Sequence, residues 1–199
     1  MRVNMVNNKT VLIVYGSPHS DGPTSRITAA FESALPDGLS AGRFDCFARM
    51  PKPCTDCRAC RTDIRCAFDD IGDYYSMIEN AGALVFCAPV YNLSFPAPMK
   101  AVIDRGQVYW SQRFVRGISF DDRLEGSTRR PAVLITAAGR DSGEMLRRQL
   151  LPALTVMGAR LISHVHYTGA DEGADIEPAL ALARSAAAGM ARDLYNQST

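Results

Sequence analysis

The chain has 199 residues, of which 47% are hydrophobic, and a formal net charge of +1. This length and composition are typical of one globular domain with a full core, so we expect a single domain over residues 1–199. Basic and acidic residues are interleaved, which argues against a nucleic-acid-binding surface or a polybasic membrane-binding face. No apolar run approaches the roughly 18–20 residues that a membrane-spanning helix needs, and the polar N-terminus lacks the apolar centre of a signal peptide. We therefore expect a cytoplasmic protein without nucleic-acid or membrane partners, whose thiols stay reduced.

Short apolar runs alternate along the chain with longer segments of helical periodicity. Three of the runs are almost continuously hydrophobic, as strands covered on both faces by helices are. A fourth, residues 43–48, alternates more and is predicted as an outer strand. The predicted strands are residues 11–16, 43–48, 83–89, 132–138 and 160–167, and the predicted helices are residues 24–35, 70–80, 97–110, a segment that begins at Ser142, and a segment from about 176 to 194.

Five such strand–helix units predict an open, doubly wound α/β sheet with right-handed crossovers. Ligands of such sheets bind beyond the carboxyl ends of the strands, where the strand order reverses. The loops that follow Gly16, Pro89 and Ala138 are therefore the predicted ligand-binding loops.

The loop after the first predicted strand is rich in hydroxyl side chains. Residues 16–28 read GSPHSDGPTSRIT, which matches neither the dinucleotide-binding glycine pattern nor a Walker A loop. Hydroxyls and free backbone N–H groups at a helix N-terminus suit a phosphate, which the helix dipole also favours. An ordinary loop of turn and capping residues is the alternative. The predicted phosphate-binding residues are Ser17, Ser20, Thr24 and Ser25.

This first loop resembles the start of the NAD(P)H-dependent FMN reductases with a flavodoxin-like fold, a group that includes the iron–sulfur flavoproteins. The resemblance continues in CAPVYNLSFPAPMKAVIDR (residues 87–105) and GARLISHVHYTGA (residues 158–170), so it spans almost the whole chain. His19 and Pro23 stand where the family often has Arg and Asn. The resemblance implies a flavodoxin-like three-layer sandwich with a five-stranded parallel sheet in the order 2-1-3-4-5.

The resemblance also implies where the flavin ring lies. The segment after the third strand should cradle the ring, and the loop after the fourth strand should approach it from the other side. A planar, mostly apolar ring needs an apolar wall together with backbone N–H and C=O groups. We nominate no catalytic acid or base, because hydride transfer from nicotinamide to flavin needs little proton transfer. The predicted ring-binding residues are Pro89, Val90, Tyr91, Asn92, Ser94, Thr136, Ala137 and Gly139.

Four titratable or charged residues are predicted to have structural roles. His164 and His166 lie on the fifth predicted strand, where packing is the usual role of a side chain. Asp104 and Arg105 are expected to form an ion pair at the surface or at an interface, which contributes little stability.

Four cysteines lie close together in the loop of residues 50–68, with the spacing C-x2-C-x2-C-x5-C. Four thiolates in a compact run resemble the ligands of a ferredoxin-type 4Fe-4S cluster, and the spacing is similar to that of iron–sulfur flavoproteins. Zinc sites more often use two separated C-x2-C pairs. Neighbouring arginines would offset the charge of thiolates with or without a metal, so free thiols, zinc and disulfides stay open as alternatives. The predicted metal ligands are Cys54, Cys57, Cys60 and Cys66, whereas Cys46 and Cys87 are predicted core residues.

The sequence therefore predicts an FMN-dependent oxidoreductase that takes electrons from NAD(P)H and reduces a small acceptor such as a free flavin, a quinone or a nitroaromatic. The first alternative is an iron–sulfur flavoprotein that passes electrons from ferredoxin through a 4Fe-4S cluster to FMN. The second is a non-enzymatic module that binds a phosphate ligand in the crevice and zinc in the cysteine loop. The resemblance implies a homodimer or a dimer of dimers.

Overall fold

The computed structural model describes residues 7–63, 65–124 and 129–196. The predicted domain of residues 1–199 thus includes some residues that lie outside the described ranges. Within these ranges five parallel strands form one sheet in the order β2-β1-β3-β4-β5, as predicted. The strands are β1 (Asn7–Tyr15), β2 (Ser40–Asp45), β3 (Ala81–Pro89), β4 (Arg130–Ala138) and β5 (Ala159–Thr168).

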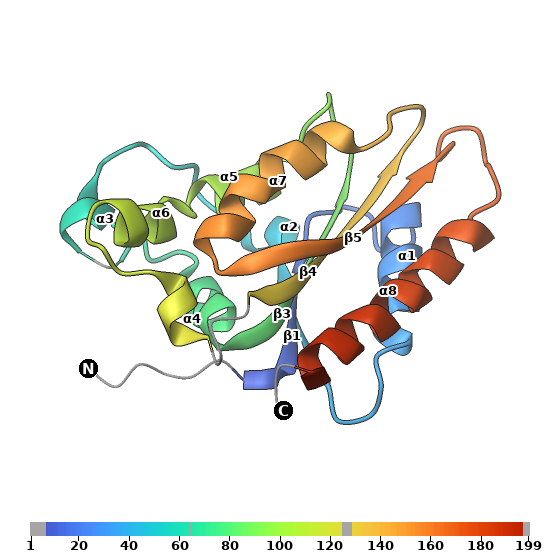
Figure 1. Cartoon of the computed structure of the whole chain (residues 1–199). Helices are drawn as coiled ribbons and strands as arrows, with labels where there is room; N and C mark the ends of the chain where they lie inside the picture. Colours follow the sequence, from blue (N-terminus) through green and yellow to red (C-terminus); the bar gives the residue numbers. More distant parts are fainter. Residues whose placement is uncertain (1–6, 64, 125–128, 197–199) are drawn as a thin grey trace.

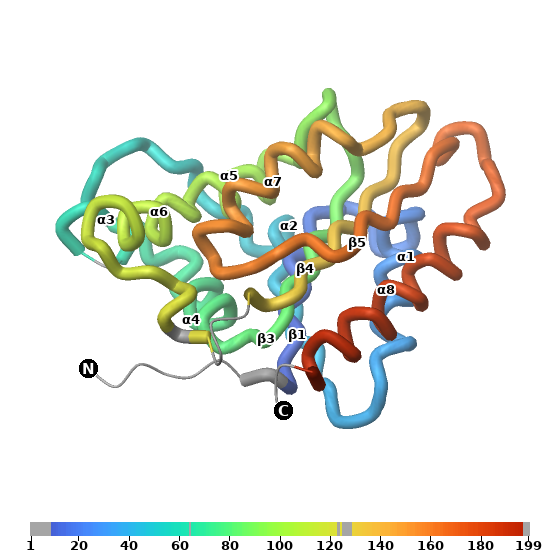
Figure 2. The backbone as a smooth tube through the Cα atoms, in the orientation of Figure 1, coloured from blue at the N-terminus to red at the C-terminus, as the bar shows by residue number. Residues whose placement is uncertain are grey.

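Helices cover both faces of the sheet (Figure 1). The helices α1 (Pro23–Ser33) and α8 (Glu177–Asn196) pack together on one face. The remaining helices lie on the side of the other face, and the path of the backbone between the layers can be followed in Figure 2. These helices are α2 (Cys46–Arg49), α3 (Ala59–Thr62), α4 (Gly72–Asn80), α5 (Ala97–Asp104), α6 (Gln107–Phe114), the 3-10 helix η1 (Phe120–Arg123) and α7 (Glu144–Val156). In the part of the chain that the structure describes, α3 packs against α6 and not against the sheet.

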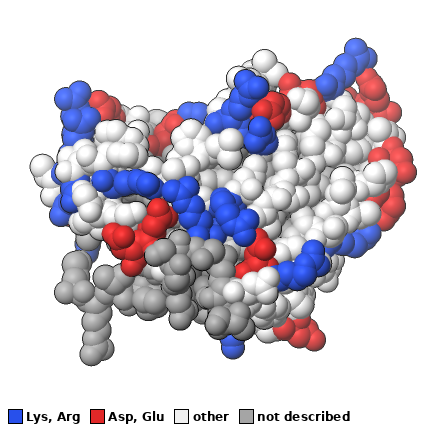
Figure 3. Space-filling view, in the orientation of Figure 1, with Lys and Arg blue, Asp and Glu red and all other residues white. Residues whose placement is uncertain are grey.

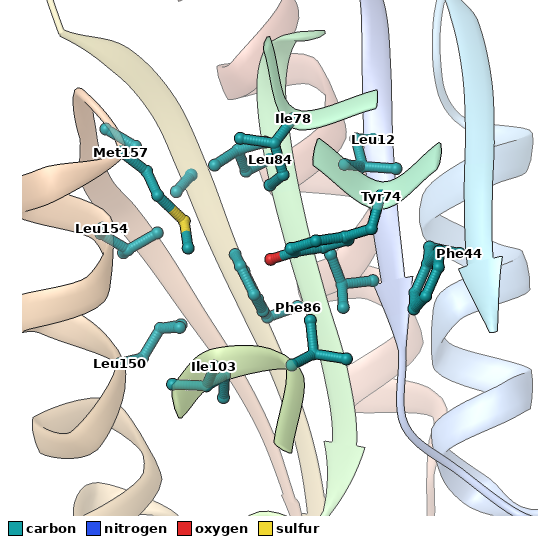
Figure 4. Packing of buried hydrophobic residues seen from close by; sticks show 14 of the residues in the cluster. Leu12, Phe44, Tyr74, Ile78, Leu84, Phe86, Ile103, Leu150, Leu154 and Met157 are labelled. Carbon is teal, nitrogen blue, oxygen red and sulfur yellow. The ribbon is translucent and has the colours of Figure 1, made fainter. Parts of the chain in front are cut away.

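The central strands are hydrophobic throughout because both of their faces are buried. Every residue of β4 is buried, and alternate residues contribute to the two clusters that lie on opposite faces of the sheet. Figure 4 shows one of these clusters, where Phe86 of the sheet packs between Tyr74 of α4 and Leu150 of α7. This two-sided packing fixes the sheet, and with it the positions of the loops at its carboxyl edge.

The structure corrects several predicted boundaries, including the three that follow. The outer strand β2 ends at Asp45, because the carboxylate of that residue accepts hydrogen bonds from the backbone N–H groups of the next helix, α2. The predicted helix 97–110 is two helices, with a break at Arg105 and Gly106. The fourth long helix begins at Glu144 instead of Ser142, after a left-handed Gly143 with a φ of 71°.

The surface carries both signs of charge side by side. On the face drawn in Figure 3, Lys and Arg side chains lie next to Asp and Glu side chains, as the near-neutral net charge of +1 leads one to expect. Among the described residues, no helix is both long enough and apolar enough to cross a bilayer.

Candidate functional site

A cleft of about 560 Å³ opens at the carboxyl edge of the sheet, within the 300–1,000 Å³ range typical of ligand pockets. Four segments meet there: the β1–α1 loop, the end of β3 with the turn that follows it, the end of β4, and the loop after β5. This is the edge at which doubly wound sheets bind their ligands. The lining residues are Ser17, His19, Gly22, Pro23, Thr24, Pro89, Val90, Tyr91, Asn92, Ala137, Ala138, Gly139, Ala170 and Asp171.

One end of the cleft is the N-terminus of α1. Gly22 is the N-cap residue and makes no side-chain cap, so the first-turn N–H groups keep their hydrogen-bonding capacity for a ligand. Ser17 and Thr24 are almost fully buried, with 6% and 2% of their surface exposed, and both line the cleft. Buried hydroxyls, free amides and the positive end of the helix dipole together favour a bound anion.

The other end of the cleft is the turn after β3. Tyr91 and Ser94 exchange two backbone hydrogen bonds of 2.9 Å across this turn. Asn92 and Leu93 adopt left-handed backbone angles, with φ values of 49° and 60°, a conformation that costs energy for residues other than glycine. The result is a tight turn that projects Tyr91, 43% exposed, at the mouth of the cleft.

A second cavity of about 580 Å³ adjoins the cleft and shares part of its wall. The two hollows have five lining residues in common: Val90, Asn92, Ala138, Gly139 and Asp171. The second cavity is also lined by Leu93, Arg140, Asp141 and Glu172. A ligand in the second cavity would therefore lie beside one held in the cleft.

The structure brings eight of the predicted cofactor-binding residues into the lining of the cleft: Ser17, Thr24, Pro89, Val90, Tyr91, Asn92, Ala137 and Gly139. The other four lie nearby but do not line it. Ser25 donates a hydrogen bond of 2.6 Å to the carbonyl of Ser20. Ser94 donates one of 3.1 Å to Gln149. Thr136 is fully buried beneath the cleft, so its hydroxyl cannot touch a ligand there.

The loop after β5 was missed as a part of the site. Asp171 and Ala170 line the cleft. A Cβ atom on Gly139 would clash with the Asp171 carboxylate, so the two loops approach as closely as a glycine allows. The available signal was topological: this loop follows the carboxyl end of a strand that lies next to β4.

Two histidines share the hydroxyl of Thr136 below the β4–α7 loop. The Thr136 Oγ1 atom lies 2.8 Å from His164 Nε2 and 2.7 Å from His166 Nδ1. Burial, followed by the neighbouring His166 and Arg147, lowers the pKa of His164 to about 4. His164 is therefore neutral at ordinary pH, and both histidines serve in hydrogen bonding within the fold.

The four cysteines of the 50–68 loop line one narrow cavity of about 30 Å³. Cys54 and Cys57 are exposed, whereas Cys60 and Cys66 are partly buried. All six cysteines lie in the described part of the chain and are free thiols. No three His, Cys, Asp or Glu side chains in the described ranges are arranged to hold a single metal ion. Cys87, by contrast, is a core residue as predicted, and burial raises the pKa of its thiol to about 12.

Arg105 lines the same cavity and corrects the expectation of a surface pair with Asp104. Its side chain is fully buried and donates to Asp70 Oδ1 at 2.6 Å and to the Phe68 carbonyl at 2.9 Å. Asp104 pairs instead with Lys100, one helical turn away. The physical reason is that the helix breaks at Arg105, which directs its side chain inward toward the end of the cysteine loop.

One donor of the Arg105 side chain has no acceptor within the described residues. Its Nε–H is buried and unpartnered there, which is costly unless an anionic or acceptor group approaches it. Because this guanidinium lines the cavity of the four thiols, the donor set suits an anionic sulfur centre in kind and number. The small cavity volume means that the loop must open to admit such a centre.

Comparison with known proteins gives a consistent result. Residues 9–172 match the family model described as NADPH-dependent FMN reductase. The chain is 36% identical over 111 residues to an FMN-dependent NADH:quinone oxidoreductase from Alkalilimnicola ehrlichii, over 53% of each chain. It is 30% identical over 103 residues to an iron–sulfur flavoprotein from Methanosarcina thermophila, over 51% of this chain and 54% of that protein. The chain spans about half the length of these curated relatives.

A solved structure shows the same fold at lower sequence identity. The NAD(P)H:quinone oxidoreductase from Methanothermobacter marburgensis superposes with a TM-score of 0.62 and 19% identity, over 89% of this chain and 94% of that one. At this identity the likeness establishes the shared fold alone.

Proposed function

Because the chain belongs to the NADPH-dependent FMN reductase family, we propose that it binds FMN in the cleft at the carboxyl edge of the sheet and uses NAD(P)H to reduce a small acceptor. The family, the fold and the dependence on FMN and NAD(P)H that goes with the family agree with what the sequence predicts. The observation that carries the proposal is the cleft itself. It joins an anion-binding helix N-terminus at one end to a backbone turn with an apolar wall at the other.

The phosphate of FMN fits the end of the cleft formed by α1. Ser17 and Thr24 supply hydroxyls, and the uncapped first turn of the helix supplies N–H donors. His19 also lines this end and can donate a hydrogen bond there. These groups recognise an anion and carry no chemistry of their own.

The ring of FMN fits the end formed by the turn after β3. Pro89 and Val90 present an apolar wall, Tyr91 offers an aromatic face, and Gly139 leaves room for a flat group on the other side. When bound, FMN supplies the two-electron redox chemistry, and the protein supplies binding and orientation. Val90 and Asn92 also border the adjoining cavity, so we assign that cavity to the nicotinamide and, in turn, to the acceptor.

The test compares FMN with riboflavin, which lacks the phosphate. Flavin titrations followed by fluorescence should show that Ser17→Ala and Thr24→Val each weaken FMN binding by about 10-fold or more, the value of a charge-assisted hydrogen bond. Riboflavin affinity should not change. Ser33→Ala is the matched control, because Ser33 lies at the far end of α1 and its hydroxyl bonds to the Ala30 carbonyl of the same helix.

Turnover assays complete this test. The FMN-loaded protein should oxidise NADH or NADPH in the presence of a quinone, a free flavin or a nitroaromatic. Protein that binds neither flavin at saturating concentration contradicts the proposal. Colourless protein with stoichiometric zinc would support instead a phosphate-ligand module with a zinc loop.

A second candidate function adds a redox centre in the cysteine loop. Four thiols line one cavity together with a buried, unpartnered Arg105 N–H, and a relative that matches half of the chain is an iron–sulfur flavoprotein. We propose Cys54, Cys57, Cys60 and Cys66 as ligands of a 4Fe-4S cluster, which would supply one-electron chemistry. Ferredoxin would then be the electron donor.

Iron and acid-labile sulfide analysis of anaerobically purified protein tests the cluster directly. Stoichiometric iron and sulfide together with FMN would support an iron–sulfur flavoprotein. FMN without iron or sulfide would leave the thiols as free groups and the nicotinamide-dependent reductase as the function.

We further propose a homodimer in the cytoplasm. Large apolar side chains are exposed along α6 and after it, including Phe114 at 60% and Val115 at 47%. Such a surface is typical of a subunit interface, and six free thiols suit a reducing compartment. Analytical ultracentrifugation should give the mass of a dimer or a dimer of dimers, and Phe114→Glu should shift it toward the monomer. A monomer at all concentrations contradicts the dimer.

A further inference from the structure

The hydrogen bonds around Thr136 fix the protons of both neighbouring histidines. His166 Nε2 lies 2.6 Å from the Asp141 carbonyl oxygen, which can only accept, so this nitrogen carries a proton. In the neutral ring, Nδ1 must then accept from the Thr136 hydroxyl at 2.7 Å. The Thr136 oxygen in turn accepts from His164 Nε2 at 2.8 Å. Three hydrogen bonds therefore run in one direction, from His164 to the backbone of the β4–α7 loop.

The strand register places these three side chains on one face of the sheet. His164 pairs with Leu134 and His166 pairs with Thr136 in the β4–β5 ladder, and Leu134 belongs to the cluster packed under α7. Because side chains alternate along a strand, Thr136 and both histidines point toward the start of α7. The charged groups that face them are Glu144 and Arg147 of α7, which are bonded to each other at 2.7 Å, and Asp141 of the loop.

The β4–α7 loop rests directly on this group of side chains. Asp141 accepts from His166 through its carbonyl and from the Gly143 N–H through its carboxylate at 2.7 Å. A Cβ atom on Gly143 would lie only 2.8 Å from Thr136 Oγ1 and 2.9 Å from His166 Nδ1. Only glycine therefore allows the loop to lie this close to Thr136 and His166.

The same loop forms one wall of the proposed flavin site. Gly139 lines both the cleft and the adjoining cavity, and Arg140 and Asp141 line the adjoining cavity. On its other side the loop is tied to the β5–α8 loop, because Gly169 N–H donates to the Gly139 carbonyl at 2.6 Å. Arg140 of the loop also pairs with Glu172 at 2.9 Å, but both side chains are exposed. The loop is thus held from two sides, and the side-chain hydrogen bonds on the histidine side are the more buried ones.

We propose that Thr136, His164 and His166 form a positioning relay that fixes the β4–α7 loop of residues 139–143, whose first residue, Gly139, lines the ring end of the cleft. The effect of the relay on flavin binding rests on the proposed function, whereas its effect on the loop does not.

The experiment uses Thr136→Val, which removes the hydroxyl and keeps the shape, with Thr136→Ser as the conservative variant. Thr155→Val is the matched control, because the Thr155 hydroxyl bonds within α7, to the Leu151 carbonyl. Thr136→Val should raise the dissociation constants of FMN and riboflavin by the same factor, about 10-fold. Equal loss for both ligands marks a defect at the ring end, whereas a loss for FMN alone would mark the phosphate end. Thr136→Ser and Thr155→Val should bind as the unmodified protein does.

A second readout needs no flavin. Amide hydrogen exchange of residues 139–143 should be about 10-fold faster in Thr136→Val than in the unmodified protein and unchanged in Thr136→Ser. Faster exchange in a protein that binds no flavin would refute the proposed function and uphold the relay. Unchanged exchange and unchanged flavin affinity in folded Thr136→Val would overturn the relay.

Discussion

The flavin cleft is made from the ends of strands that are fixed in the sheet, whereas the cysteine loop lies between two helices, α2 and α4, with only the four-residue α3 of its own. Ser17 and Thr24 in the cleft are almost fully buried, but Cys54 and Cys57 in the loop are exposed. The cleft is therefore formed before any ligand arrives. The geometry of the loop depends on the buried Arg105, on a few hydrogen bonds from neighbouring elements such as the one between Cys60 and Ser111, and on what its thiols bind.

This contrast implies that the two sites can be lost separately. Cys57→Ala removes one of the four thiols, so the protein should lose all stably bound iron, because a cubane cluster needs four thiolates. FMN affinity should not change, since no cysteine lines the cleft within the described residues. Metal analysis and flavin titration on the same sample measure both effects.

The control for this variant is Thr55→Ala, in the same loop. It should retain any iron that the unmodified protein binds. Loss of FMN in Cys57→Ala would show that the two sites are coupled, which would contradict the claim that they can be lost separately.

The anchor of the cysteine loop gives the next largest effect. Arg105→Met leaves Asp70 without its cation and frees the Phe68 carbonyl. Removing one partner of a buried ion pair costs about 3–5 kcal/mol, and the partial exposure of Asp70 places the expected loss of unfolding free energy at about 3 kcal/mol. Urea unfolding measures it.

Lys100→Met is the matched control, because Lys100 and Asp104 form an exposed pair on the same helix. Its cost should be below about 1 kcal/mol. Equal losses of unfolding free energy in the two variants would show that the buried pair of Arg105 and Asp70 is no stronger than an exposed pair. Arg105 would then not be an anchor of the cysteine loop.

The histidines beneath the cleft predict a smaller, pH-dependent effect. The pKa of His164 is lowered to about 4, from about 6.5 for an ordinary histidine. Between about pH 4 and 6.5 His164 binds a proton more readily in the unfolded chain than in the folded chain. The contribution of His164 to the free energy of unfolding is therefore fully present above about pH 6.5 and is lost as the pH decreases toward 4. After allowance for partial exposure, the expected loss is about 1–2 kcal/mol.

Unfolding curves at several pH values for His164→Leu test this prediction. The variant should lack that part of the acid dependence, whereas His19→Leu, at an exposed histidine of the cleft, should keep it. The same acid dependence in His164→Leu and in the unmodified protein would contradict the assignment.

Much of the fold could be predicted because its signals are local. The hydrophobic runs of β1, β3 and β4 can be recognised in the sequence, and they locate the carboxyl edge where Ser17, Pro89 and Gly139 meet. Hydroxyls before a helix likewise predict an anion site without knowledge of the rest of the chain.

The remaining features depend on contacts between distant residues. Arg105 turns inward to pair with Asp70. The two residues are 35 positions apart in the sequence, so no local pattern indicates that they meet. Thr136 meets His166 only through the β4–β5 register, which contains an irregularity between Ala132 and Val133. A one-residue shift of register would move these side chains to the opposite face, so no local pattern could specify the contact.

The most direct test of the central claim is a crystal structure of the protein with FMN. The account predicts the phosphate at the N-terminus of α1 beside Ser17 and Thr24, with the ring between Tyr91 and Gly139. A flavin bound elsewhere, or this cleft without flavin in crystals grown at saturating FMN, would contradict it.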